Sequence, residues 1–147
     1  MNTFFMKEAI REAQKAANLG EVPIGAVIVK NGIIVGRGHN TRESEEVAYG
    51  HAEINAIKDA SAKLGSWRLT GCSIYVTIEP CPMCAGALYQ ARINEIYYGA
   101  SDPKAGACGS VFDLFSVEGL NHYCHVFPGI LSDECKSLLQ SFFRKRR

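Results

Sequence analysis

The chain has 147 residues, of which 47% are hydrophobic and 21% charged, and this is the size and composition of one folded domain of about 100 to 200 residues. We therefore expect a single domain over residues 1–147 and exclude a mainly disordered chain. Sixteen Lys and Arg residues and fifteen Asp and Glu residues give a net charge of +1, which excludes a strong positive field that would attract DNA or an anionic membrane.

The first half of the chain predicts two helices and a hairpin. Apolar residues recur every three or four positions from Phe5 to Asn18, which is typical of an amphipathic helix. Two β-branched runs are joined by Lys30-Asn31-Gly32, and Asn-Gly favours a hairpin because both turn residues need positive φ. The expected elements are a helix over 5–18, strands over 24–29 and 33–35, a loop over 42–46 and a helix over 52–64.

The second half alternates strands with helices. Pro82 suits the first turn of a helix, where its missing N–H costs no hydrogen bond. This alternation, after a hairpin, predicts an α/β domain, a three-layer α/β/α sandwich with a mixed five-stranded sheet and the hairpin at its antiparallel edge. The expected elements are strands over 72–77, 95–98 and 126–127, a loop over 102–110, and helices over 82–91, 111–115 and from 132 to the end.

The six cysteines point to metal binding or catalysis. No apolar run near the N-terminus reaches the roughly 7 to 15 residues of a secretory segment, and none elsewhere approaches the roughly 18 of a membrane-spanning helix. We therefore expect a cytoplasmic protein without a membrane partner. In a reducing compartment, cysteines serve metals or catalysis more often than disulfides.

Two motifs carry the chemistry, and each begins a predicted helix: His51-Ala52-Glu53 and Pro80-Cys81-Pro82-Met83-Cys84. A helix N-terminus favours the thiolate form that binds metal. One imidazole and two thiolates suit zinc, and three protein ligands leave the fourth tetrahedral position for water. Glu53 is then a general base and acid for that water. The pattern H-x-E followed by P-C-x-x-C is a known signature of zinc nucleobase deaminases.

Other interpretations of the cysteines remain open. Cys81 and Cys84 could form a redox pair, although such a motif does not predict an upstream His-x-Glu. A closed structural zinc site could recruit Cys108, Cys124 or His125 as a fourth ligand. The segment from His122 to His125 alternates as an extended strand does, which favours a structural or surface role for its side chains.

Longer blocks of sequence show a resemblance to one family. From about Met6 to Arg146 the chain resembles the bacterial tRNA-specific adenosine deaminases, which convert the wobble adenosine of an anticodon to inosine. It departs from them at Val47-Ala48-Tyr49-Gly50, where a Pro-Thr-Ala type of segment is usual. The matching blocks are Gly20-Glu21-Val22-Pro23-Ile24-Gly25-Ala26-Val27, His39-Asn40, His51-Ala52-Glu53-Ile54, Pro80-Cys81-Pro82-Met83-Cys84-Ala85-Gly86-Ala87, Tyr98-Gly99-Ala100, Asp102-Pro103-Lys104 and Phe142-Phe143-Arg144.

The resemblance implies a cytidine-deaminase-like sandwich with one zinc ion (Zn²⁺) per chain. It makes His51, Cys81 and Cys84 the zinc ligands and Glu53 the proton shuttle. It also places Asn40 and Ala52 at the target base. An asparagine suits this role because its amide offers both a donor and an acceptor. The less favoured alternative is that Asn40 is a turn residue after Gly38.

The resemblance further implies a homodimer whose partner is the anticodon stem-loop of a tRNA. Arg42, Lys104, Phe143 and Arg144 are the residues expected to face this RNA, with solvated loop charges as the alternative for Arg42 and Lys104. The last four residues are all basic, and we expect them both to contact phosphates and to complement the negative end of the last helix.

The hypothesis from sequence is therefore a hydrolytic, zinc-dependent deaminase of the wobble adenosine. Two rivals remain: a free-base deaminase acting on guanine or cytosine, and a non-catalytic RNA-binding module stabilised by zinc. Turnover of defined substrates separates the three.

Overall fold

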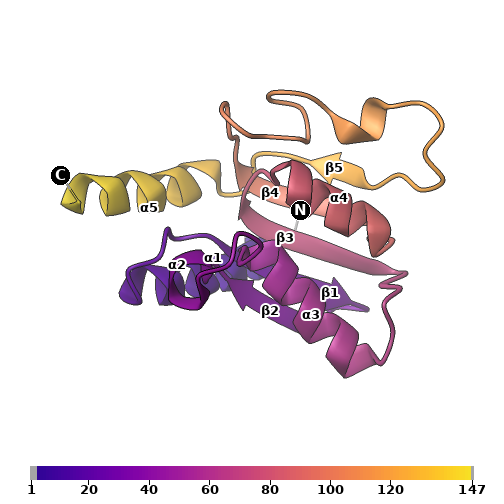
Figure 1. The fold of residues 1–147 in the computed structure, drawn as a ribbon, viewed down its shortest axis with the longest axis horizontal. Helices are drawn as coiled ribbons and strands as arrows, with labels where there is room; N and C mark the ends of the chain where they lie inside the picture. The colour runs from indigo at the N-terminus through magenta and orange to yellow at the C-terminus, as the bar shows by residue number, and fades with distance from the viewer. Residues whose placement is uncertain (1–2, 147) are drawn as a thin grey trace.

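The computed structural model describes residues 3–146, which form one mixed sheet with helices on both faces (Figure 1). Within residues 3–146, five helices and five strands follow one another, with one 3₁₀ turn, η1, before the last strand. In chain order the elements are α1 (Thr3–Asn18), β1 (Gly25–Lys30), β2 (Ile33–His39), α2 (Arg42–Glu45), α3 (Ala52–Leu64), β3 (Cys72–Ile78), α4 (Pro82–Gln90), β4 (Glu95–Ala100), η1 (Leu114–Ser116), β5 (His125–Phe127) and α5 (Ser132–Lys145).

The five strands lie in the order β2-β1-β3-β4-β5. Strand β1 is antiparallel to both of its neighbours, β2 and β3, whereas β3, β4 and β5 are parallel to one another. The mixed sheet with an antiparallel hairpin at one edge is therefore confirmed. The hairpin turn is also as predicted, because Asn31 and Gly32 have φ values of 51° and 75°.

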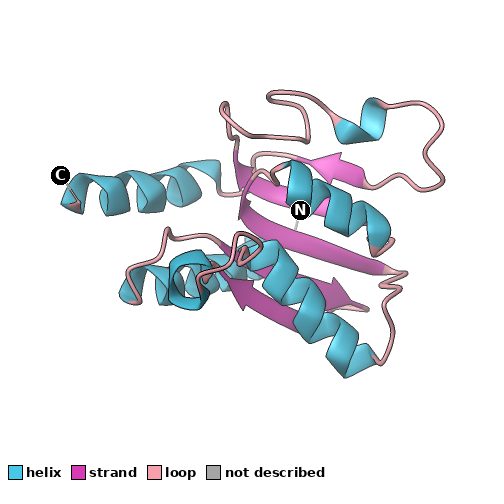
Figure 2. Cartoon of the chain, viewed as in Figure 1, coloured by secondary structure: helices cyan, strands magenta, loops and turns pink. Residues whose placement is uncertain are grey.

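Helices cover both faces of the sheet and bury two hydrophobic clusters (Figure 2). Residues of α3 and α4 pack with Ile28, Ile74 and Ile96 on one face. Residues of α1 and the start of α5 pack with Val27 and Tyr75 on the other. The predicted three-layer α/β/α sandwich is confirmed. Beyond its first turn α5 runs clear of the sheet (Figure 1), and Cys135 is its buried residue.

Three local expectations were wrong. The strand expected over 33–35 continues through two glycines to residue 39, because it pairs with β1 as far as that residue. The charged segment 42–46, expected to be a loop, contains the one-turn helix α2, whose N–H groups at Glu43 and Ser44 donate to the distant Glu21 carboxylate. The helix expected over 111–115 is instead η1, which begins three residues later because the Asp113 side chain accepts the N–H of Phe115 at 3.0 Å.

Helix α3 lies against β2 at two glycines. A Cβ at Gly38 would lie 2.3 Å from the carbonyl oxygen of Ala52, and one at Gly36 would lie 2.6 Å from that of Ala56. These glycines therefore set how closely the N-terminal end of α3 approaches the sheet. Within residues 3–146, no helix is both long and apolar enough to cross a membrane.

Gly38→Ala should destabilise the protein, because its Cβ would overlap the backbone at the start of α3. We expect a loss of about 1 to 3 kcal/mol in the free energy of unfolding, as for other overpacked sites. Gly86→Ala is the matched control: no atom would lie within 4 Å of its Cβ, so it should stabilise α4 by about 0.5 to 1 kcal/mol. Denaturant unfolding measures both, and equal effects would contradict this packing.

Candidate metal centre and substrate site

The sheet topology brings the two sequence motifs together. Strands β2 and β3 are each antiparallel to β1 and therefore parallel to each other. Their C-terminal ends lie at the same end of the sheet. Helices α3 and α4 follow these two ends on one face, and their N-terminal ends converge (Figure 1). His51 and Cys81 are the N-cap residues of α3 and α4, with extended backbones at φ −93° and −75°.

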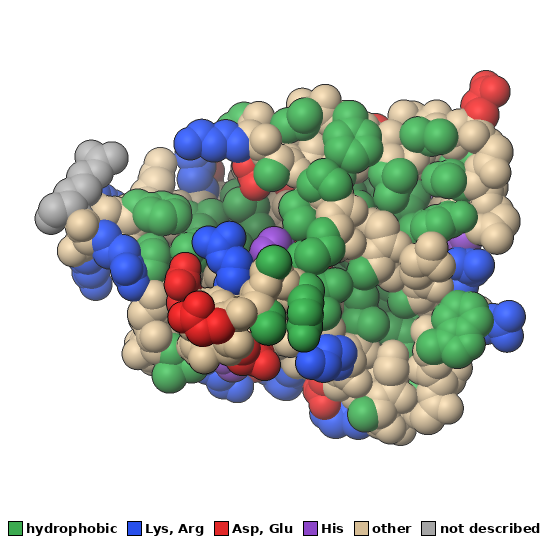
Figure 3. Space-filling view, viewed as in Figure 1, with side chains coloured by type: hydrophobic (Ala, Val, Ile, Leu, Met, Phe, Trp, Pro, Cys, Tyr) green, Lys and Arg blue, Asp and Glu red, His purple; other side chains and the backbone are tan. Residues whose placement is uncertain are grey.

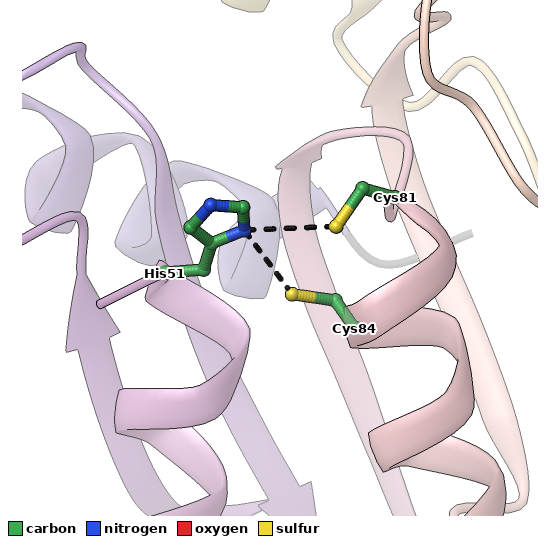
Figure 4. Close-up of side chains that lie close together, drawn as sticks. All are labelled: His51, Cys81 and Cys84. Carbon is green, nitrogen blue, oxygen red and sulfur yellow. Dashed lines mark hydrogen bonds between the residues drawn. The ribbon is translucent and has the colours of Figure 1, made fainter. Parts of the chain in front are cut away.

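Three side chains meet where these two helices begin (Figure 4). The Nδ1 atom of His51 lies 3.6 Å from the Sγ atom of Cys81 and 3.4 Å from that of Cys84. The three ligand atoms lie within 4.8 Å of one another. Zinc–sulfur and zinc–nitrogen bonds of about 2.3 and 2.0 Å in a tetrahedral site separate such atoms by about 3.5 Å. The donor set and its spacing therefore fit a zinc ion.

The two thiols of the cluster differ in acidity. Hydrogen bonds from Cys84 and His51 lower the pKa of Cys81 to about 4. The pKa of Cys84 is raised, by its hydrogen bond to Cys81 and by burial. The pair therefore keeps one proton at neutral pH, and a metal cation would compete for the sulfur that carries it.

Glu53 lies beside the cluster in the first turn of α3. It is 3% exposed, and burial raises its pKa to about 7. The nearby His51 imidazole and Cys84 thiol oppose this shift only in part. A carboxyl with a pKa near neutral can both accept and donate a proton, which is the requirement for acid and base catalysis.

Asn40 lies at the end of β2 and is 6% exposed. Its Oδ1 accepts the N–H of Arg42 at 3.1 Å, and its Nδ2 donates to the carbonyl of Val22 at 3.3 Å. These two bonds hold the Asn40 side chain between the segment before β1 and the start of α2. An asparagine amide has two N–H donors and two acceptor lone pairs, so one of each remains for a base.

The other predicted contact residues differ in exposure. Ala52 is fully buried, and its backbone N–H lies in the first turn of α3, where helix N–H groups have no partner within the helix. Arg42, the first residue of α2, and Lys104, on the 101–111 loop, are both exposed. Phe143 and Arg144 are exposed on the projecting part of α5 (Figure 1). Arg147, part of the basic tail, lies outside the described residues.

The four remaining cysteines do not join the cluster. Cys72, Cys108, Cys124 and Cys135 are all buried and free. Among residues 3–146, the groups of His, Cys, Asp and Glu that could hold a metal comprise only the three ligands described above. No fourth protein ligand closes the site there, which disfavours the closed structural zinc. His122 instead contacts the carbonyl of Ile93 through Nε2 at 2.7 Å.

Two buried carboxylates that the sequence patterns did not predict organise the surrounding loops. Glu21 and Glu79 are each 1% exposed. Burial opposes their ionisation, but hydrogen bonds from Ser44 and Glu43 to Glu21, and from Ser110, Asp102 and Cys108 to Glu79, hold both pKa values below the ordinary range. The sequence signal for Glu79 was its position directly after the β-branched run of β3, where a buried charge is stable only when it is paired.

Comparison with known proteins agrees with this geometry. The chain matches the MafB19-like deaminase family over residues 2–147. It is 50% identical over 143 residues to the tRNA-specific adenosine deaminase of Bacillus subtilis, covering 97% of this chain and 89% of that protein. The chain belongs to the tRNA-specific adenosine deaminase family.

Solved structures agree with this membership in the tRNA-specific adenosine deaminase family. One, from a study of A-to-I editing by tRNA:A34 deaminases at the wobble position of transfer RNA, superimposes with a TM-score of 0.90 and 43% identity, covering 94% of this chain and 100% of that one. A guanine deaminase from Bacillus subtilis superimposes with a TM-score of 0.67 and 32% identity, covering 98% and 95%. The fold thus also occurs in deaminases of a free base.

Proposed function

We propose that this protein hydrolyses the wobble adenosine of a tRNA anticodon loop to inosine, releasing ammonia. The observation that carries the proposal is the cluster of His51, Cys81 and Cys84 with the buried Glu53 beside it. This cluster lies in a chain 50% identical to a tRNA-specific adenosine deaminase. We further propose that residues 1–147 act as one domain in the cytoplasm.

His51, Cys81 and Cys84 would hold one zinc ion per chain. When bound, zinc supplies Lewis-acid chemistry that lowers the pKa of a water molecule toward about 7. The protein contributes the rigid placement of its ligands, since His51 and Cys81 are fixed as N-cap residues. The positive ends of α3 and α4 stabilise the anionic sulfur atoms.

Glu53 moves the protons of the reaction. Its carboxylate takes a proton from the water that adds to the amine-bearing ring carbon and delivers it to the adjacent ring nitrogen. It then takes the proton of the hydroxyl group now on that carbon and passes it to the amine, so the C–N bond breaks, ammonia leaves and the carbonyl of inosine forms. A pKa near 7 allows the same group to act in both directions.

Asn40 and the backbone N–H of Ala52 would orient the flipped base. One N–H of the Asn40 amide already donates to Val22, and one lone pair of its oxygen already accepts from Arg42. These bonds fix the direction of the second N–H and the second lone pair, which would contact the base. A base in a loop is extruded at lower cost than one in a duplex.

Basic and aromatic side chains would bind the RNA around this pocket. In the space-filling view, Lys and Arg side chains lie beside the hollow where α3 and α4 begin (Figure 3). Arg42, Lys104, Phe143 and Arg144 would contact the anticodon stem-loop. Exposed apolar side chains gather over α3, α4 and the segment before β5 (Figure 3), and we propose this face as the contact with a second copy in a homodimer.

Turnover of four substrates tests the proposed function. The purified protein is offered a tRNA with a wobble adenosine, the isolated anticodon stem-loop, free guanine and free cytosine, and ammonia and inosine are measured. We expect inosine from both RNAs. Product from guanine or cytosine alone would assign a free-base deaminase, and RNA binding without any product would assign the non-catalytic binding module.

Cys84→Ala should abolish stoichiometric zinc binding, because two ligands hold zinc far less tightly than three. Elemental analysis of fresh, reduced protein should give one zinc per wild-type chain and little in the variant. Cys72→Ala is the matched control, since Cys72 is equally buried but lies outside the cluster. Full zinc in Cys84→Ala would refute the assignment.

Glu53→Gln should keep the fold and the zinc but lose at least about a hundredfold in turnover, given the 10² to 10⁴ that acid and base groups contribute. The amide preserves shape and cannot shuttle the proton. Zinc content and turnover of the stem-loop are measured on one preparation. Near wild-type turnover in the zinc-replete variant would remove Glu53 from the mechanism.

The basic tail should contribute to RNA affinity in a salt-dependent way. Engagement of about three phosphates gives a slope of about −2 to −3 for the logarithm of affinity against that of salt. Arg144→Gln with Lys145→Gln should flatten this slope by about 1.5. Arg146 is left intact because it donates to the carbonyl of Gly20 and covers the Phe142 ring.

The effect should be similar for stem-loops with and without the target adenosine, because phosphate contacts position the RNA without reading the base. The matched control replaces two exposed lysines of α3, Lys58→Gln with Lys63→Gln. Equal slopes for the wild type and the tail variant would place the RNA-binding surface elsewhere. The basic residues of the tail would then serve only to complement the negative C-terminal end of α5.

A further inference from the structure

The loop from Ser101 to Val111 is wound around one buried carboxylate, that of Glu79. Its Oε1 atom accepts the N–H of Asp102 at 3.0 Å, and its Oε2 atom accepts those of Cys108 and Ser110, both at 3.0 Å. The Ser110 hydroxyl also donates to Oε1. Donors from the beginning and the end of the loop therefore converge on one side chain.

The loop also closes tightly over this carboxylate at Gly106. A Cβ at Gly106 would lie 2.3 Å from the carboxyl carbon of Glu79 and 2.4 Å from each of its oxygens. The next residue, Ala107, donates its N–H to the carbonyl of Pro80 at 2.9 Å. Since Pro80 directly precedes Cys81, the loop is fixed to the chain that enters the metal cluster.

The chemistry of these contacts requires an ionised acid. A carboxylate offers four lone-pair sites and no donor, which matches three N–H groups and one hydroxyl. A glutamine would turn an NH₂ group toward backbone N–H donors and leave buried groups unpaired. The carboxylate therefore holds the loop in one backbone conformation, with the exposed Lys104 at its tip.

We propose that Glu79 is a positioning residue for RNA binding: it fixes the 101–111 loop beside the metal cluster before the substrate arrives. The proposal rests on the proposed function and names how that site is prepared for RNA. A loop ordered in advance spares the ordering cost of binding. Loss of the carboxylate should therefore weaken RNA binding more than it slows the chemical step.

Glu79→Gln is the first test. We expect the KM for the stem-loop, and the Kd measured without turnover, to rise at least about tenfold, with kcat within about threefold of wild type and zinc retained. Amide hydrogen exchange of Asp102, Cys108 and Ser110, followed by NMR, should accelerate. The control is Glu12→Gln, because Glu12 is 3% exposed but pairs with the side chains of Lys15 and Arg37.

Gly106→Ala is an independent route to the same loop, because its Cβ meets the carboxylate. It should reproduce the rise in KM and Kd. In the double variant Glu79→Ala with Gly106→Ala the overlapping atoms are gone, so the two effects should be less than additive. These variants keep the test decisive if Glu79→Gln does not fold.

Unchanged exchange at the three amides, or unchanged KM and Kd, would overturn the proposal. Loss of zinc with a parallel fall in kcat would also overturn it, since Glu79 would then act on the metal ligands. An inactive wild-type protein would contradict the proposed function, whereas the exchange rates and Kd would still decide the role of Glu79.

Discussion

The meeting of the two sequence motifs depends on one antiparallel strand, β1. Because β1 runs antiparallel to both β2 and β3, these two strands end together. Helices α3 and α4, which follow these strands, lie on the same face of the sheet and begin at this end. His51 and the two cysteines meet only because of this arrangement, although 30 residues separate His51 from Cys81. The close approach of α3 to β2 at Gly36 and Gly38 fixes the remaining distance.

Buried carboxylates fix the segments that surround the His51, Cys81 and Cys84 cluster. Glu21 holds the start of α2, and Glu79 holds the 101–111 loop, each through backbone N–H groups far away in the sequence. Glu53 differs from both in its surroundings. It lacks enough donors to offset burial, so its pKa rises to about 7 where those of Glu21 and Glu79 fall. Hydrogen-bond supply thus separates the group proposed for proton transfer from two structural ones.

Local sequence signals predicted most of the fold. The Asn-Gly turn, Gly65 and Pro82 mark boundaries that the structure confirms at a hairpin, a helix end and a helix start. The H-x-E and P-C-x-x-C motifs predicted the cluster because their residue types and spacing are set by metal chemistry. Helix α2 and the roles of Glu21 and Glu79 escaped prediction because their partners are distant in the chain. Asn40 was assigned to the base, and the structure adds its two internal hydrogen bonds.

The central claim is that the His51, Cys81 and Cys84 cluster is the catalytic centre. Titration of zinc into metal-free protein, with inosine formed in a wobble-adenosine stem-loop as the readout, tests it most directly. Activity should rise linearly from near zero and level off at one zinc per chain. Substantial inosine formation in the metal-free protein, or a plateau unrelated to that stoichiometry, would contradict the account.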